Sequence, residues 1–332
     1  MTMDNQIKHL LDELFPCDKK EELNLSIVTA ADESFFDLLQ LMLYSILSKH
    51  KVKIYVFDLG LTSKSIKWLK GLNIKIKKPK KLQFEKGIKG WQTYNKPFYI
   101  KEIKDPVILW LDCDLVVLKS LIPLESTISD KPLFTQCFPE VDPIRQMRTH
   151  GDPMLAENIL HNVMETNLIP HQTGPPYNNG GVLGMDKRRK IDNKLLEKWI
   201  NVSIKVSNNE ELIQVTQGGY WDQCILQWVL ESENELLNIS KNKGWNYPEK
   251  IKHDFIEQIN YLHENKNERR VPNYRRKHGR IISDPWTFHP PPTISHFFGE
   301  QKKERTWSPR HPGSHMIPCF KDVKYLIEDN TL

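Results

Sequence analysis

Cysteine is scarce in this sequence, and its spacing is irregular. The five cysteines form no CxxC pair and no cluster with histidine at the spacing of zinc ligands. An odd number of widely separated cysteines argues against a disulfide framework, and the absence of a Cys/His cluster argues against a structural zinc site. A reducing compartment fits this usage best.

Long apolar segments are also missing. No stretch reaches the roughly 18 apolar residues that a membrane-spanning helix requires. The N-terminus carries Asp4 early and lacks the apolar core of a signal peptide. From these absences we expect a soluble, cytoplasmic protein.

Neither sign of charge dominates. The net charge of +5 arises from 47 basic and 42 acidic residues, which is compatible with an anionic ligand but does not by itself support nucleic-acid binding. Basic residues cluster at 75–81 and at 269–280. Such runs commonly form a solvated surface; the alternative is a patch that attracts an acidic acceptor or a membrane surface.

Apolar residues, by contrast, follow a clear periodic order. Short apolar runs at 25–30, 52–60 and 73–78 alternate with helical stripes at 34–47 and 62–72. This alternation is typical of a parallel sheet with helical crossovers. The expected elements outside these five are helices at 5–15, 154–166, 191–204 and 220–231, strands at 105–117, 178–185 and 294–299, and a loop at 262–280.

The run 105–117 is the most apolar of the predicted strands, and it belongs at the centre of the sheet, where helices cover both faces. We therefore expect one Rossmann-like α/β domain, with a mostly parallel central sheet flanked by helices, over residues 23–310. A helical extension precedes it at 1–22, and a C-terminal extension follows it at 311–332.

Two carboxylates interrupt this central strand. Asp112 and Asp114 are two residues apart, so a strand places them on the same side. At the carboxyl end of a buried parallel strand they would face the crevice in which α/β sheets bind ligands. Two like charges so close together call for a cation, and a divalent ion that bridges a diphosphate supplies one. The alternative is a pair of solvated aspartates at the end of a strand.

Other polar residues in strand-like runs admit both a structural and a functional interpretation. His296, at the end of an apolar run, suits an ion such as Mn²⁺ but equally suits a packed core. The glycines after Asn178 and Asn179 permit close approach of a ligand or a β-bulge. Asp222 is either a helix N-cap or a functional acid.

The order of these motifs resembles the family 8 glycosyltransferases, which include glycogenin and bacterial lipopolysaccharide galactosyltransferases. The similarity covers roughly residues 24–308. The motifs, in order, are VTAAD near the start, NKP at 95–97, LDCD, NNGGV, DQ, WN at 245–246 and HFFG with a following lysine. As a set they imply the glycosyltransferase type-A fold.

The resemblance also implies where the donor binds. Asp112, Asp114 and His296 match the family's manganese ligands, and Lys96 matches a basic residue near the donor diphosphate and sugar. Gly299 and Lys302 match a phosphate-binding tail, although the family's KPW is replaced here by KKERTW, which lengthens that loop.

Further site residues follow from the same resemblance. Thr29, Ala30 and Asp32 fall in the uridine-binding loop. Phe35 or Phe36 stands where the family usually has tyrosine, which keeps base stacking and removes a hydroxyl. The residues that match positions around the donor sugar and its anomeric carbon are Asn179, Asp222 and Gln223.

The implied activity is transfer of a hexose from a UDP-sugar, with Mn²⁺ or Mg²⁺, to a glycan, lipid-linked glycan or protein acceptor. Retention of anomeric configuration is implied by the resemblance alone. Two alternatives stay open: an inverting glycosyltransferase on the same fold, and a non-catalytic carbohydrate-binding protein. A sugar-phosphate nucleotidyltransferase is disfavoured, because VTAADESFF lacks a glycine-rich basic loop for a triphosphate.

Overall fold

The structure is a computed structural model. It describes residues 19–79, 95–117, 120–130, 132–136 and 178–209, and then short pieces at 222, 225–226, 229–230, 274–275, 281–282 and 294–296. The predicted helices at 5–15 and 154–166 and the predicted extension at 311–332 lie outside the described residues.

A six-stranded sheet forms the centre of the described fold, in the order β3-β2-β1-β4-β7-β6. The first four of these strands are mutually parallel, β7 runs antiparallel to β4, and β6 runs antiparallel to β7. The strands are β1 (Glu21–Ala31), β2 (His50–Asp58), β3 (Lys75–Lys77), β4 (Val107–Leu111), β6 (Leu133–Gln136) and β7 (Asn178–Asp186). The predicted α/β class with a mostly parallel central sheet is confirmed.

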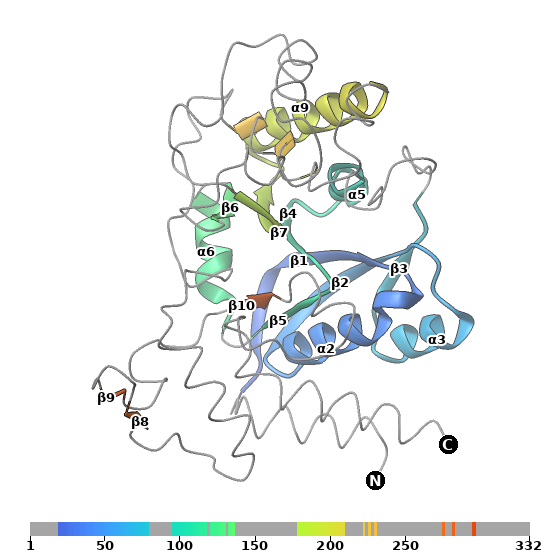
Figure 1. The fold of residues 1–332 in the computed structure, drawn as a ribbon, viewed down its shortest axis with the longest axis vertical. Coiled ribbons are helices and arrows are strands. Elements are labelled where there is room, and N and C mark those ends of the chain that lie inside the picture. Colours follow the sequence, from blue (N-terminus) through green and yellow to red (C-terminus); the bar gives the residue numbers. More distant parts are fainter. Residues whose placement is uncertain are drawn as a thin grey trace.

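Helices cover both faces of this sheet. Figure 1 shows α2 and α3 on one side and α5 and α9 on the other. The helical elements are η1 (Glu33–Phe35), α2 (Phe36–Leu47), α3 (Ser63–Gly71), α5 (Lys96–Glu102), α6 (Ile122–Asp130) and α9 (Lys190–Ser207). The two faces bury separate apolar clusters, one containing Leu39 and Met42 of α2 and the other Trp199 of α9.

Local sequence explains where these helices begin. Thr62 caps α3 by accepting a hydrogen bond from the Ser65 N–H over 3.3 Å. Pro97 lies in the first turn of α5, where its missing N–H costs nothing. In α9 the buried residues Leu195, Leu196 and Trp199 recur at helical spacing, so one side of the helix faces the core.

The predicted central strand at 105–117 is two strands in the structure. β4 ends at Leu111, residues 113 and 114 form a turn, and β5 (Leu115–Val117) leaves the main sheet to pair with β10 (Ile294–His296). β4 extends only over the apolar run VILWL, because a regular strand that continued through 112–114 would place both carboxylates between hydrophobic layers. The prediction that Asp112 and Asp114 share one side of a regular strand is therefore wrong.

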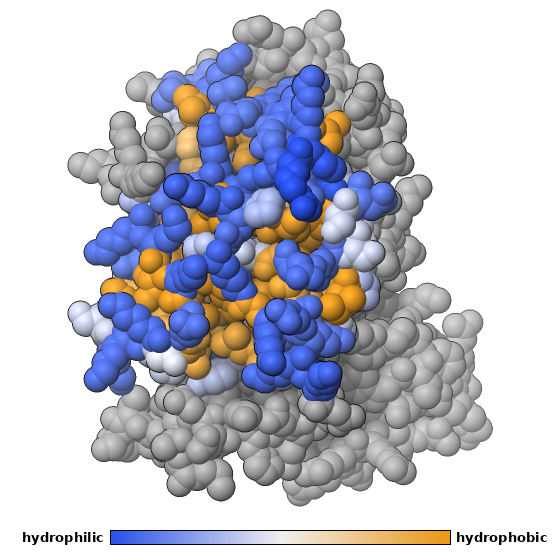
Figure 2. Space-filling model, turned by 180° about the vertical axis from the view of Figure 1, so that it is seen from behind, coloured by the Kyte–Doolittle hydropathy of each residue, from blue (hydrophilic) through white to orange (hydrophobic). Residues whose placement is uncertain are grey.

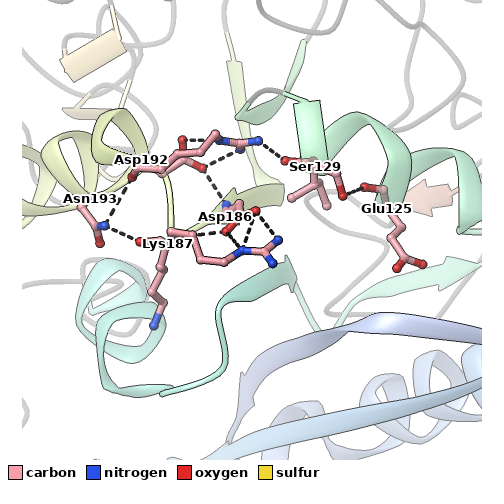
Figure 3. A network of polar contacts seen from close by, with 9 residues as sticks. Glu125, Ser129, Asp186, Lys187, Asp192 and Asn193 are labelled. Atoms are coloured by element: carbon pink, nitrogen blue, oxygen red, sulfur yellow. Dashed lines mark hydrogen bonds and ion pairs between the residues drawn. The ribbon is translucent and has the colours of Figure 1, made fainter.

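A polar network fastens the end of β7 to the start of α9 (Figure 3). Arg188 binds Asp186 over 2.6 Å, Arg189 binds Asp192 over 2.7 Å, and the Asp186 N–H donates to Asp192 over 2.6 Å. Asp186 pairs in register with Val107, the first residue of β4. We call Asp186, Arg188, Arg189 and Asp192 the amino-edge cluster, because they lie where β4 begins.

One face of the described surface mixes hydrophilic and apolar side chains. Figure 2 shows hydrophilic side chains over much of one face, with apolar side chains between them. Among the described residues, Ile122 is the large apolar residue with a substantially exposed side chain, at 39%. Within the same ranges, no helix is both long and apolar enough to cross a bilayer.

Candidate active site

The strand order reverses between β1 and β4. β1 continues through α2 to β2 on one side, whereas β4 lies on the other side of β1. Ligands of open α/β sheets bind at the carboxyl ends of strands beside such a reversal. Here Ala31 ends β1, and Asp112 directly follows β4. The reversal of strand order therefore lies beside Asp112, which the sequence predicts as a metal ligand.

Asp112 is held from two directions as the chain leaves β4. Its backbone N–H donates to the carbonyl of Gly181 in β7 over 2.8 Å, which extends the ladder by one bond. Its Oδ1 accepts a hydrogen bond from Nε1 of Trp110 over 2.8 Å. The side chain is 21% exposed. The carboxylate is therefore oriented, yet it still has an open side.

Lys96 joins Asp112 to a second carboxylate. Its Nζ lies 3.0 Å from Oδ1 of Asp112 and 3.1 Å from Oδ2 of Asp222. It also donates to the carbonyl of Gly180 over 3.1 Å. We call Lys96, Asp112 and Asp222 the carboxyl-edge cluster. It brings together residues that the sequence analysis assigned to the donor site from three distant segments.

The electrostatics of Lys96 follow from this placement. Burial opposes its positive charge, but the charges of Asp112 and Asp222 outweigh burial, and the pKa of Lys96 lies above its ordinary value. Lys96 is therefore charged at neutral pH. Among the residues that the structure describes, one ammonium faces two carboxylates, so the cluster has more acidic than basic side chains.

The segments that carry the predicted metal ligands converge. Asp114 is buried in the turn after β4. β10 pairs antiparallel with β5 and places His296 opposite Leu115, the neighbour of Asp114 (Figure 1). The His296 side chain lies outside what the structure describes. Within the described residues alone, no group of three potential metal-ligand side chains is present.

The predicted uridine loop follows β1 at the same edge of the sheet. Thr29 is fully buried, and its Oγ1 makes no hydrogen bond to any residue that the structure describes. Asp32 accepts a hydrogen bond from the Ser34 N–H over 3.0 Å and so caps η1, while Phe35 packs partly buried against the α2 core. Ala30 is partly exposed.

Several predicted residues are placed only in part. The backbone of Asn179 pairs with Thr135 of β6, and its side chain is not described. Gln223, Gly299 and Lys302 lie outside the described residues. From the basic stretch 269–280 the structure describes only Tyr274–Arg275 (β8), whose backbone pairs with Ile281–Ile282 (β9).

Two contributors to the site escaped the sequence analysis. Trp110 donates to Asp112, and the carbonyl of Gly180 accepts from Lys96. The tryptophan had a detectable signal, because residues two apart in a strand share a face. The carbonyl had none, because backbone groups carry no sequence signature.

Comparison with known proteins supports the fold. No protein-family model matches the sequence, and no curated protein does. Among solved structures, 93% of the chain matches 51% of the bifunctional glycosyltransferase WbbM, with a TM-score of 0.53 and 11% identity. The chain thus spans about half of that protein.

Two further structures match with lower scores. One is the galactosyltransferase LgtC in complex with donor and acceptor sugar analogs, with 20% identity over 90% of this chain and 95% of that chain and a TM-score of 0.46. The other is mouse xyloside xylosyltransferase 1, with 12% identity over 83% of this chain and 98% of that chain and a TM-score of 0.45. At such identities the likeness concerns the fold. The WbbM match supports the expected glycosyltransferase type-A fold.

Proposed function

We propose that this protein is a glycosyltransferase that transfers a hexose from a UDP-sugar with the help of a divalent cation. The observation that carries the proposal is the carboxyl-edge cluster, in which Lys96 lies within 3.1 Å of Asp112 and Asp222 beside the reversal of strand order. A buried cation next to carboxylates, at the edge where such folds bind ligands, suits a donor with a charged diphosphate and a polar sugar.

The residues of this cluster match the charges that develop during transfer. Cleavage of a glycosyl–phosphate bond leaves negative charge on the diphosphate and positive charge on the sugar ring. Lys96 is already held by hydrogen bonds, so its ammonium can stabilise the leaving diphosphate with little reorganisation. Asp222, on the other side of Lys96, can stabilise the positively charged sugar.

The donor atoms around the turn after β4 fit Mn²⁺ in kind. Asp112 and Asp114 offer carboxylates, and the backbone of His296 pairs with Leu115, which directly follows Asp114. Carboxylate and imidazole together suit Mn²⁺ better than Mg²⁺. These three residues would hold the ion, which would stabilise the diphosphate as a Lewis acid. The excess of carboxylates over ammonium groups among the described residues of the carboxyl-edge cluster supports a further cation there.

The acceptor and the stereochemistry are proposed from the motif resemblance. The motif resemblance favours retention of anomeric configuration and a glycan, lipid-linked glycan or protein acceptor. An inverting enzyme would need a carboxylate base on the acceptor side. The basic segment 269–280 is proposed to contact an acidic acceptor or a membrane surface, and cytoplasmic location is proposed from the sequence alone.

Release of UDP from a panel of UDP-sugars tests the function without knowledge of the acceptor, because slow hydrolysis accompanies transfer. We expect release that requires Mn²⁺, stops with a chelator and is lost in Asp114→Ala. In a thermal-shift assay with Mn²⁺, UDP should stabilise the protein more than GDP, CMP or ADP. Absence of any metal-dependent nucleotide binding would favour the non-catalytic alternative, and a larger shift with GDP would refute the uracil preference.

A further inference from the structure

Trp110 is joined to the candidate site by its indole N–H. The side chain is almost fully buried in β4, and a buried indole N–H needs an acceptor. That acceptor is Oδ1 of Asp112, at 2.8 Å. Hydrogen bonds to a carboxylate are stronger than those between neutral groups. The position of Trp110 therefore constrains the orientation of this carboxylate.

Trp110 is itself fixed by aromatic packing. Its ring stacks on Tyr99 with centroids 6.1 Å apart and an interplanar angle of 18°. Tyr99 stacks in turn on Phe57 of β2, with centroids 4.6 Å apart. Because Phe57 and Trp110 lie on strands of the rigid sheet, this row of three rings leaves the indole little freedom to rotate.

Helix α5 acts on Asp112 by two routes. It carries Tyr99, which packs on Trp110, and three residues earlier it carries Lys96, whose Nζ contacts both oxygens of Asp112 at 3.0 and 3.1 Å. The indole of Trp110 and the ammonium of Lys96 thus both fix the orientation of the Asp112 carboxylate. The side chain remains 21% exposed, so this grip leaves an open side.

We propose that Trp110 is a positioning residue that orients Asp112 toward a divalent cation and the donor, an inference that rests on the proposed function. The indole N–H occupies one side of Oδ1 and leaves the exposed side of the carboxylate for the ligand. Partners that orient a metal ligand typically contribute about 10–100-fold to metal affinity or activity. Trp110→Phe should lower metal-dependent affinity without removing any ligand.

The primary test is calorimetric titration of Mn²⁺ with UDP into Trp110→Phe, which keeps an aromatic ring on Tyr99 but lacks the N–H. We expect binding about 10-fold weaker than in the wild type. Trp199→Phe is the matched control, because Trp199 lies in the same core on α9. It should lose thermal stability to a similar extent and keep its affinity. Equal affinity losses in the two variants would reduce Trp110 to a packing residue.

A double-mutant cycle shows whether Trp110 acts through Asp112. In an Asp112→Ala background there is no carboxylate to orient, so Trp110→Phe should cause little further loss of affinity. The same fold-loss in both backgrounds would overturn the proposal. If the wild type itself shows no metal-dependent UDP binding, the proposed function fails. Binding by the wild type that Trp110→Phe leaves unchanged overturns only this inference.

Discussion

The two ends of β4 carry polar clusters of different composition. The amino-edge cluster pairs two aspartates with two arginines, and each guanidinium has its own carboxylate within 2.7 Å (Figure 3). The carboxyl-edge cluster sets one lysine between two aspartates at 3.0–3.1 Å. Counted over the described residues, the first cluster has equal numbers of acidic and basic side chains, and the second has more acidic ones.

This difference separates a structural role from a functional one. Buried charges in a balanced set satisfy one another, and such a set needs no further partner. A buried excess of carboxylate is unfavourable unless a cation or a substrate group completes it. Both clusters contain buried aspartates, so burial alone does not distinguish them. The two clusters are distinguished by the ratio of cations to carboxylates and by their position at opposite edges of the sheet.

The largest expected effect comes from removing the single cation of the carboxyl-edge cluster. Lys96→Met leaves Asp112 and Asp222 facing each other without an ammonium. By analogy with the loss of one preorganised donor, we expect about 10²–10³-fold slower UDP release. Leaving buried charges unpaired should also cost about 3–5 kcal/mol of unfolding free energy. Donor hydrolysis and urea denaturation measure the two effects.

A second variant separates these two effects of Lys96. Lys96→Met combined with Asp222→Asn removes one negative charge together with the ammonium. The double variant should recover much of the lost stability and none of the lost activity. Recovery of activity would show that Lys96 serves only to neutralise Asp222.

A nearly equal loss of stability, without loss of function, is expected at the other end of β4. Asp192 is fully buried and accepts hydrogen bonds from Arg189 and from the Asp186 N–H. Asp192→Ala leaves both donors without this acceptor and should cost about 3 kcal/mol. Metal-dependent UDP affinity should stay unchanged in the folded variant. A large loss of affinity would mean that the two clusters are coupled.

His296→Ala tests whether a residue of β10 contributes to cation binding beside the carboxyl-edge cluster. If the imidazole binds the same cation as Asp112 and Asp114, we expect metal-dependent UDP binding to weaken by about 10–100-fold. His315→Ala, in the predicted C-terminal extension, is the control and should bind normally. Unchanged affinity in His296→Ala would leave this histidine as a packing residue and remove the third predicted ligand.

Much of the fold around the two clusters was foreseeable from the sequence, because it depends on local patterns. The alternation of strands and helices and the apolar run before Asp112 follow from side-chain periodicity. The turn at 113–114 was missed, since LVV is equally apolar whether the strand continues or leaves the sheet. Arginines 188 and 189 gave no signal of a balanced cluster, because the pairing depends on how α9 packs after β7.

The approach of Lys96 to Asp222 could not be derived from spacing either. These residues lie on separate segments of the chain. Because α5 packs against the sheet face on which Asp222 also lies, Nζ of Lys96 comes to 3.1 Å from Oδ2 of Asp222. The motif resemblance assigned Lys96 and Asp222 to the donor site but did not predict that they contact each other. Tertiary structure therefore added the charge ratio on which the comparison of the two clusters depends.

The smallest expected effect is a pH dependence beside the amino-edge cluster. Lys187 lies between Asp186 and Arg188, and its Nζ donates to the carbonyl of Ile103. Burial lowers the pKa of Lys187 to about 8, against an opposing effect of Asp105. Between about pH 8 and the ordinary lysine pKa of about 10.4, the unfolded chain holds a proton that the folded protein has released. Stability from this group should therefore rise with pH across that interval, and the cost of burying the ammonium is fully present below it.

Lys187→Met should remove this slope, so that the wild type gains stability relative to the variant as the pH rises from about 7 to about 10. Because Lys187 is only partly buried, solvent screening should hold the gain to about 1 kcal/mol or less. Urea denaturation of both proteins across this range gives the difference and cancels the titration of tyrosines and cysteines common to both. Lys101→Met, which removes an exposed lysine paired with Glu197, controls for the loss of a positive charge. Parallel stability curves for the wild type and Lys187→Met would mean that this ammonium keeps its proton in the folded protein, and that the balanced end of β4 tolerates one more cation than its pairing requires.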